Sequence, residues 1–330
     1  MRRLFALLQP VLIGVALIFI IALLAVQWDE LRSYRWTLRP GWLLLSMLLL
    51  LASWAMEIGI WRHLLGLVDA QLPFWPAVRI WFQSAVVRYI PGNVWQPLSM
   101  TLQCQRWSIR AEATLTSVAL YQAVILLAVA PIAALYVGVT GNVGLLSEFL
   151  AGMTIWLVAA GLLPVAVFLA RPGLLIGAIN WALNKVGRTP LPTHLTSARL
   201  LGLLAAAALN WLLWGGSFAA LAYALGDYTA ARMLALLPHL IAAYPIAYAI
   251  GFLSFITPSG FGVREGAFYV LLAPMMGGGV VTVIALAMRL WTTLGELLMA
   301  GAMTLLAPAA PAQETSATVL APLPTDEPLR

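Results

Sequence analysis

The feature that most constrains the fold of this chain is a series of apolar runs, each close to the length that crosses a lipid bilayer. A helix needs about 20 consecutive apolar residues to span the hydrocarbon core. Runs near this length occupy residues 10–26, 41–61, 113–137, 149–170, 200–225 and 280–306. Because lipid offers the backbone no hydrogen-bond partner, such a chain folds as a bundle of helices within the membrane.

The shortage of charge supports the same conclusion. Only 9% of the 330 residues are charged, whereas soluble domains carry about 25%. This composition excludes a soluble enzyme, a nucleic-acid-binding protein and a disordered chain. The net charge of +6 is explained by the excess of arginine that cytoplasmic loops carry in membrane proteins.

Metal and disulfide chemistry find little support in the sequence. Cys104 is the single cysteine, so no internal disulfide can form. No CxxC motif is present, and the three histidines, His63, His194 and His239, lie far apart. We therefore expect no cofactor and no metal.

Two apolar segments contain breaks that an ordinary membrane helix would not have. Residues 74–100 include Pro91-Gly92-Asn93, and residues 233–275 include the stretch from Thr257 to Gly266. Proline and glycine free backbone groups that only protein or a wet cavity can satisfy within a membrane. We interpret both segments as re-entrant helical hairpins that line a site.

The distribution of basic residues predicts the topology. With a cytoplasmic N-terminus, six spans and two hairpins, ten basic residues fall in inside loops and four in outside loops. We therefore expect an all-α membrane domain over residues 1–307, both termini in the cytoplasm, and a disordered cytoplasmic tail over residues 308–330. Eight ordinary transmembrane helices are the alternative.

The two breaks also predict an internal repeat. Pro91 and Pro258 lie 167 residues apart, about half the chain. In the predicted topology the first hairpin enters from the cytoplasm and the second from outside. This is the pattern of an inverted repeat, in which broken helices meet near the midplane and form a substrate site. The halves would cover residues 41–170 and 197–306, and chance similarity of two short breaks is the alternative.

Six ionisable residues lie within apolar sequence, where each costs at least about 2.5–3.5 kcal/mol if it faces the bilayer centre. They are Glu57, Arg88, Arg264, Glu265, Arg289 and Glu296. We expect them to face the protein interior and to pair there. Arg289 and Glu296 share a helix face but stand two turns apart, so each needs a partner from another segment. Buried ion pairs that only fix helix packing are the alternative.

These features together predict a site for a phosphate group. A helix that starts after Gly262 would offer its positive end to an anion, and arginine side chains would add forked donors. The predicted substrate-binding residues are Arg88, Pro91, Gly92, Asn93, Gln96, Pro258, Ser259, Gly260, Gly262, Arg264, Glu265, Arg289 and Glu296. Glu57, Glu265 and Glu296 are the candidate proton carriers, and no catalytic residue is predicted.

The stretches Arg88–Trp95 and Thr257–Gly266 resemble motifs of the transmembrane domain of lysylphosphatidylglycerol synthases, a flippase-like family. The resemblance covers about residues 5–306 and implies lipid transport. In two-domain members a cytoplasmic synthase domain makes aminoacylated phosphatidylglycerol and the membrane domain is thought to translocate it. We expect a stand-alone member without the synthase domain. Stand-alone members are associated with diverse lipids, so the resemblance does not specify which lipid is moved.

We therefore expect a flippase or scramblase of the bacterial plasma membrane that moves a lipid with a phosphate-containing headgroup, and not an enzyme. Its partners would be phospholipids or isoprenoid-linked lipids, with a separate lipid-synthesising enzyme or a second copy of the chain as further candidates, and no nucleic acid. The alternatives are a transporter of a soluble anion, a membrane-embedded lipid transferase and a scaffold for a lipid synthase.

Overall fold

The structure is a computed structural model that describes residues 25, 28–87, 95–140, 154–185, 187, 189, 195–254, 260 and 262–306. The described part is helical and contains no strand beyond an isolated bridge between Trp36 and Gly226. The helices are α2 (Trp28–Ser33), α3 (Pro40–Gly66), α4 (Phe74–Val86), α5 (Trp95–Gln105), α6 (Ala111–Leu127), α7 (Val129–Thr140), α9 (Thr154–Ala170), α10 (Pro172–Lys185), α11 (Ser197–Leu225), α12 (Ala230–Leu253), α13 (Val263–Met276) and α14 (Gly278–Leu306). The predicted first span over residues 10–26 and the predicted tail over 308–330 lie outside the described residues.

The described helices confirm an all-α membrane protein. Five stretches are long and apolar enough to cross a bilayer: α3, α6 together with α7, α11, α12 and α14. A sixth is reached if α9 and α10, which meet at a bend of 98°, count as one span. Leucines such as Leu44 (62% exposed) and Leu290 (71% exposed) point outward, where lipid would cover them. The exact number of spans and the re-entrant hairpins stay predictions.

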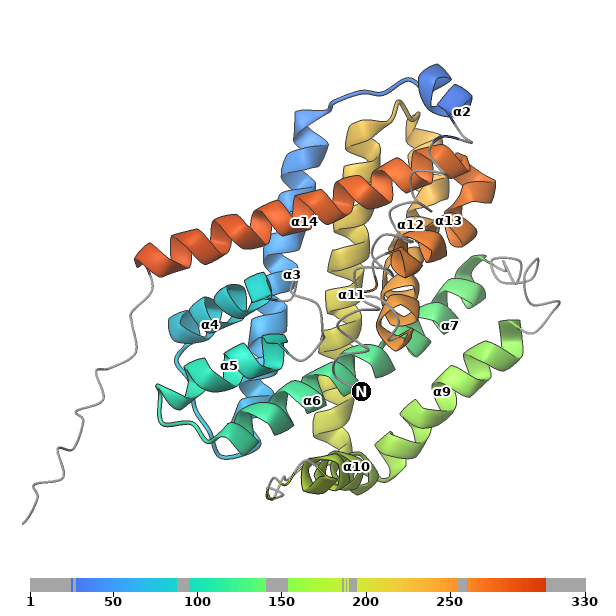
Figure 1. The fold of residues 1–330 in the computed structure, drawn as a ribbon. Coiled ribbons are helices and arrows are strands. Elements are labelled where there is room, and N and C mark those ends of the chain that lie inside the picture. Colours follow the sequence, from blue (N-terminus) through green and yellow to red (C-terminus); the bar gives the residue numbers. More distant parts are fainter. Residues whose placement is uncertain are drawn as a thin grey trace, which may run out of the picture.

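The antiparallel pair α3 and α11 forms the centre of the bundle (Figure 1). Ser46 and Ser217 exchange hydrogen bonds, each hydroxyl donating to the other's carbonyl oxygen over 2.9 Å. Two turns further along each helix in opposite directions, the Ser53 hydroxyl donates to Asn210 Oδ1 over 3.0 Å. Hydroxyl and amide groups of this kind join helices in membranes because lipid cannot satisfy them.

Two further pairs of helices pack against this centre. Helices α4 and α5, of 13 and 11 residues, are each too short to span a bilayer. They are joined side by side through Gln103, whose amide donates to the hydroxyls of Ser84 and Ser99. In the second pair, α12 has 24 residues and α13 has 14. Helix α12 is thus long enough to cross the membrane, which the sequence interpretation as a hairpin did not anticipate.

Helix α14 contacts both the pair α4 and α5 and the pair α12 and α13. It packs against α13 and α4 and runs across the bundle between them (Figure 1). Near its end, Gln83 of α4 donates to the Thr304 hydroxyl over 3.1 Å. Because α14 contacts elements from both broken segments, it fixes the distance between them.

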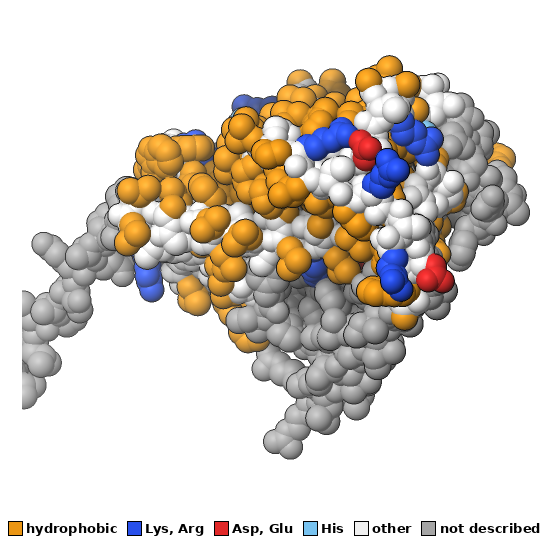
Figure 2. Space-filling view, turned by 90° about the horizontal axis from the view of Figure 1, so that it is seen from above, with side chains coloured by type: hydrophobic (Ala, Val, Ile, Leu, Met, Phe, Trp, Pro, Cys, Tyr) orange, Lys and Arg blue, Asp and Glu red, His pale blue; other side chains and the backbone are white. Residues whose placement is uncertain are grey.

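One end of the bundle is closed by the segment that precedes α3. The backbone N–H groups of Thr37 and Arg39 donate to carbonyls at the end of α11, and Arg39 forms an ion pair with Asp227. Figure 2 shows this end from above, with charged side chains gathered over part of the face and hydrophobic side chains over much of the rest. Mixed charged and apolar surface is typical of the headgroup region of a membrane protein.

Candidate functional site

A cavity of about 470 Å³ lies inside the bundle, and both broken segments contribute to its wall. The first segment contributes Gln96 and Pro97 from the first turn of α5. The second contributes Gly260, just before α13, and Arg264 in the first turn of α13. The rest of the wall comes from α3, α4, α6, α11, α12 and α14. The starts of two half-helices that are far apart in the sequence therefore meet at one cavity.

Arg264 lies on this wall, and part of its guanidinium has no hydrogen-bond partner in the described part of the chain. Its guanidinium carbon lies 5.2 Å from the ring centre of Tyr244 and 5.8 Å from that of Phe268. The two nitrogens Nε and Nη2 are buried and have no hydrogen-bond partner in the described part of the chain. Buried donors are normally satisfied, because an unsatisfied one costs the full desolvation penalty. The arrangement therefore fits an acceptor that comes from outside the described residues, such as a bound ligand.

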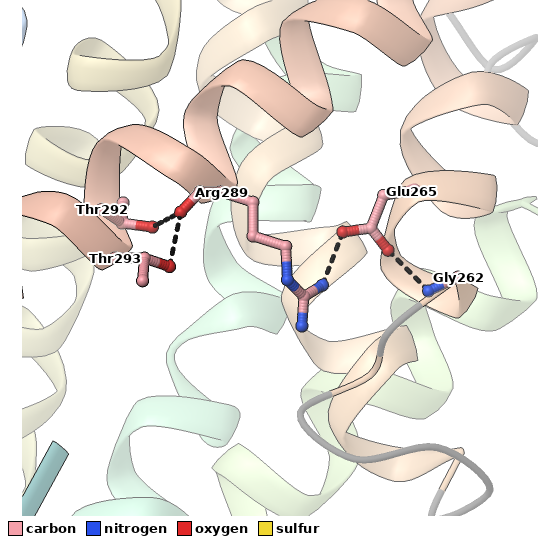
Figure 3. Close-up of polar contacts among 5 residues, drawn as sticks. All are labelled: Gly262, Glu265, Arg289, Thr292 and Thr293. Atoms are coloured by element: carbon pink, nitrogen blue, oxygen red, sulfur yellow. Dashed lines mark hydrogen bonds and ion pairs between the residues drawn. The ribbon is translucent and has the colours of Figure 1, made fainter. Parts of the chain in front are cut away.

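Arg289, by contrast, is paired with Glu265. Its Nη1 donates to Glu265 Oε1 over 2.7 Å, while Glu265 Oε2 accepts from the backbone N–H of Gly262, also over 2.7 Å (Figure 3). The Glu265 side chain is 2% exposed and the Arg289 side chain 18% exposed. Glu265 thus caps α13 and ties it to α14, and it does not belong to the cavity wall. Arg289 lies on the cavity wall, and its positive charge is paired with the carboxylate of Glu265, which lies outside the wall.

Carboxylates also face the cavity. Glu57 Oε1 accepts from Trp214 Nε1 over 2.8 Å and from Asn210 Nδ2 over 3.3 Å. Glu296 lies on the wall and is 4% exposed. The ionisable residues of the wall therefore carry both signs. Aromatic side chains also line the wall: Trp81, Tyr121, Trp211, Trp214, Tyr244, Tyr248 and Phe252.

Arg264 is positioned by a contact between two glycines. A Cβ on Gly260 would lie 3.0–3.1 Å from backbone atoms of Gly251, and Gly260 has φ of +67°. A Cβ on Gly251 would lie 3.2 Å from Arg264 Cβ. Gly260 therefore requires glycine for its left-handed conformation, and the close approach leaves little room for a side chain at either position. This contact brings the end of α12 against the start of α13 and turns Arg264 toward the cavity.

We expect Gly260→Ala to lower the free energy of unfolding by about 2 kcal/mol or more, because it combines left-handed strain with a backbone clash. Gly266→Ala is the matched control, since a Cβ there meets nothing within 4 Å and alanine favours a helix. Thermal unfolding of the purified protein in detergent would measure both variants. Equal melting temperatures for the two would show that the glycine contact does not hold this turn.

The structure brings together most of the predicted site residues that it describes. Gln96, Gly260, Arg264, Arg289 and Glu296 lie on the cavity wall, as does Glu57. Gly262 and Glu265 lie behind the wall and support it. The remaining predicted residues lie outside the described part of the chain: Arg88, Pro91, Gly92, Asn93, Pro258 and Ser259.

Sequence reasoning missed the aromatic residues of the site. Tyr244 and Phe268 hold the Arg264 guanidinium, and the Trp214 indole binds Glu57. Nothing in the sequence marks these three residues, since aromatic side chains occur throughout the chain. The one usable signal is that a charge within an apolar helix needs neighbours from other helices.

The fold and this cavity define a class: a multi-pass α-helical membrane protein with charged residues enclosed within its apolar part. Over residues 11–300 the chain matches the family described as the lysylphosphatidylglycerol synthase TM region. It therefore belongs to this family, which confirms the resemblance seen in its two motifs and fits a lipid-related role in a membrane. No curated protein matches the chain significantly.

Proposed function

We propose that this protein is a flippase or scramblase that moves a lipid with a phosphate-containing headgroup between the leaflets of a bacterial plasma membrane. The observation that carries the proposal is the Arg264 guanidinium, which has two buried nitrogens without a partner in the described part of the chain and stands on a cavity shared by both broken segments. A phosphate oxygen is the acceptor that best matches a guanidinium fork.

The size of the cavity favours a headgroup over a whole lipid. Pockets that enclose small molecules measure about 300–1,000 Å³, and this one measures about 470 Å³. We infer that the headgroup enters the cavity while the acyl chains stay in the bilayer. The aromatic and aliphatic part of the wall would then follow the glycerol portion of the lipid.

The order and packing of the helices support an inverted repeat. Each half consists of a long helix, a broken pair and a second long helix. The first long helices, α3 and α11, begin 157 residues apart at Pro40 and Ser197. Ser53 and Asn210 are also 157 residues apart, and they bond to each other across this antiparallel pair. Equivalent residues touch in this way on a two-fold axis that relates the halves, and such repeats provide alternating access to a central site.

The driving force would be either a lipid gradient or coupling to an ion. Of the candidate proton carriers, Glu57 and Glu296 face the cavity. Both oxygens of Glu265 are engaged, one by Arg289 and one by Gly262. We therefore propose Glu57 or Glu296 as the coupling residue and assign Glu265 to the support of the site.

Reconstitution into liposomes tests the proposal. Liposomes of phosphatidylglycerol and phosphatidylethanolamine would carry a phospholipid labelled on its headgroup, and a membrane-impermeant reductant would bleach the outer leaflet. We expect the wild-type protein to expose the inner-leaflet label to bleaching, and protein-free liposomes to keep it. Inner-leaflet label that stays protected at every protein density would contradict the proposal.

A transporter of a soluble anion is the second candidate, because the same Arg264 nitrogens could donate hydrogen bonds to free phosphate. Uptake of inorganic phosphate into the same liposomes separates the two. Phosphate uptake without bleaching of the inner leaflet would favour the soluble substrate.

A further inference from the structure

The second long helices of the two halves place equivalent residues on the cavity. Stretch Ala111–Thr140, made of α6 and α7, has 30 residues, and α14 has 29. Gln122 is the twelfth residue from the start of the first, and Arg289 is the twelfth residue of the second. Both lie on the cavity wall. The same holds one turn further on for Ile125 and Thr292, which are also on the wall.

The chemistry of the two sides differs in a regular way. On the long helices, the first half supplies the amide of Gln122 where the second supplies the guanidinium of Arg289. In the first turns of the half-helices, the first half supplies Gln96 where the second supplies Arg264. At these two positions the first half therefore supplies neutral amides where the second half supplies guanidinium groups.

We infer that Gln122 is a specificity-determining residue that forms, with Gln96, a second and uncharged contact site for the phosphate of the headgroup. This inference rests on the proposed function. When the two halves exchange conformations, the equivalent residue of the other half meets the headgroup. The phosphate thus passes from Arg264 and Arg289 to Gln122 on its way between the leaflets.

The present contacts of Gln122 are compatible with this role. Its Nε2 donates to Tyr248 Oη over 3.3 Å, and Tyr248 Oη lies 3.5 Å from its Oε1. These are long hydrogen bonds, near the limit at which such contacts stabilise, so an anionic oxygen can replace them. An amide offers two hydrogen-bond donors without a fixed charge. A site that binds its ligand weakly also releases it readily, as selective pores require for conduction.

Two substitutions separate binding from release. We expect Gln122→Ala to slow translocation by about fivefold to tenfold, the range of one lost neutral hydrogen bond. Gln122→Arg should also slow translocation but should bind sn-glycerol 3-phosphate more tightly in detergent, because a fixed charge traps the phosphate. Gln103→Ala is the control, since Gln103 bonds to Ser84 and Ser99 between α4 and α5 and does not line the cavity.

The results of these experiments distinguish a failure of the inference about Gln122 from a failure of the proposed function. If Arg264→Ala slows translocation and Gln122→Ala does not, the inference is wrong and the proposed function stands. Wild-type liposomes that behave like protein-free ones overturn both. A Gln122→Arg variant that binds sn-glycerol 3-phosphate no better than the wild type would also overturn the inference. Should the alanine variant melt early, Gln122→Glu, of similar size, takes its place, and repulsion of the phosphate should slow it at least as much.

Discussion

Arg264→Ala should slow lipid translocation at least about tenfold, the loss expected for one charge-assisted hydrogen bond to a phosphate. The same change should not unfold the protein. Two buried nitrogens of the guanidinium have no hydrogen-bond partner in the described part of the chain, so its removal takes away a cost as well as the packing on Tyr244 and Phe268. We therefore expect a melting temperature equal to or above that of the wild type, the usual sign of a residue kept for function at the expense of stability.

Two variants sharpen this test. Arg264→Lys keeps the charge but loses the fork, so it should translocate faster than Arg264→Ala and more slowly than the wild type. Arg106→Ala removes an exposed arginine that does not line the cavity, and it should have no effect. Liposome bleaching rates at matched protein density measure all three. Wild-type translocation by Arg264→Ala would remove this residue from the substrate site.

Glu265→Ala should have the largest effect on stability, a loss of about 3–5 kcal/mol in the free energy of unfolding. It removes the buried carboxylate that pairs with Arg289, whose own side chain is 18% exposed, and it removes the cap from the first turn of α13. The exposed pair Arg39 and Asp227 is the matched control, where Asp227→Asn should cost no more than about 1 kcal/mol. Thermal unfolding in detergent compares the two.

The double variant Glu265→Ala with Arg289→Met identifies the cause. Since the single variant loses the ion pair between Glu265 and Arg289, removing the arginine as well should recover part of the lost stability. Additive losses in the double variant would indicate that the pair does not act as a unit. If Glu265→Gln kept full stability and altered only the pH dependence of transport, Glu265 would be a proton carrier and its assignment as a supporting residue would be wrong.

Much of the fold could be predicted because hydropathy reports directly on contact with lipid. The apolar runs at 41–61, 113–137, 200–225 and 280–306 correspond to α3, α6 with α7, α11 and α14. The length of α12 was not predicted, because the prolines within it, Pro238 and Pro245, do not end the helix. Neighbouring helices can satisfy the backbone groups that such prolines release.

The sequence predicted which charged residues belong to the site, but it did not predict which of them form ion pairs with each other. A charge within apolar sequence must turn inward, which places Glu57, Arg264, Arg289 and Glu296 on one cavity. Which of these bond to each other depends on distances between helices that no local pattern encodes. Glu265, next to Arg264 in the sequence, therefore emerged as a supporting residue only from the geometry.

The most direct test of the central claim is to locate the lipid itself. Cryo-electron microscopy of the wild-type protein in nanodiscs of phosphatidylglycerol and phosphatidylethanolamine would show whether a headgroup occupies the cavity. We expect phosphate density about 2.7–2.9 Å from the Arg264 guanidinium, the distance of a charge-assisted hydrogen bond, between the first turns of α5 and α13. Lipid found only on the outer surface of the bundle, with Arg264 bonded to other parts of the chain, would contradict the account.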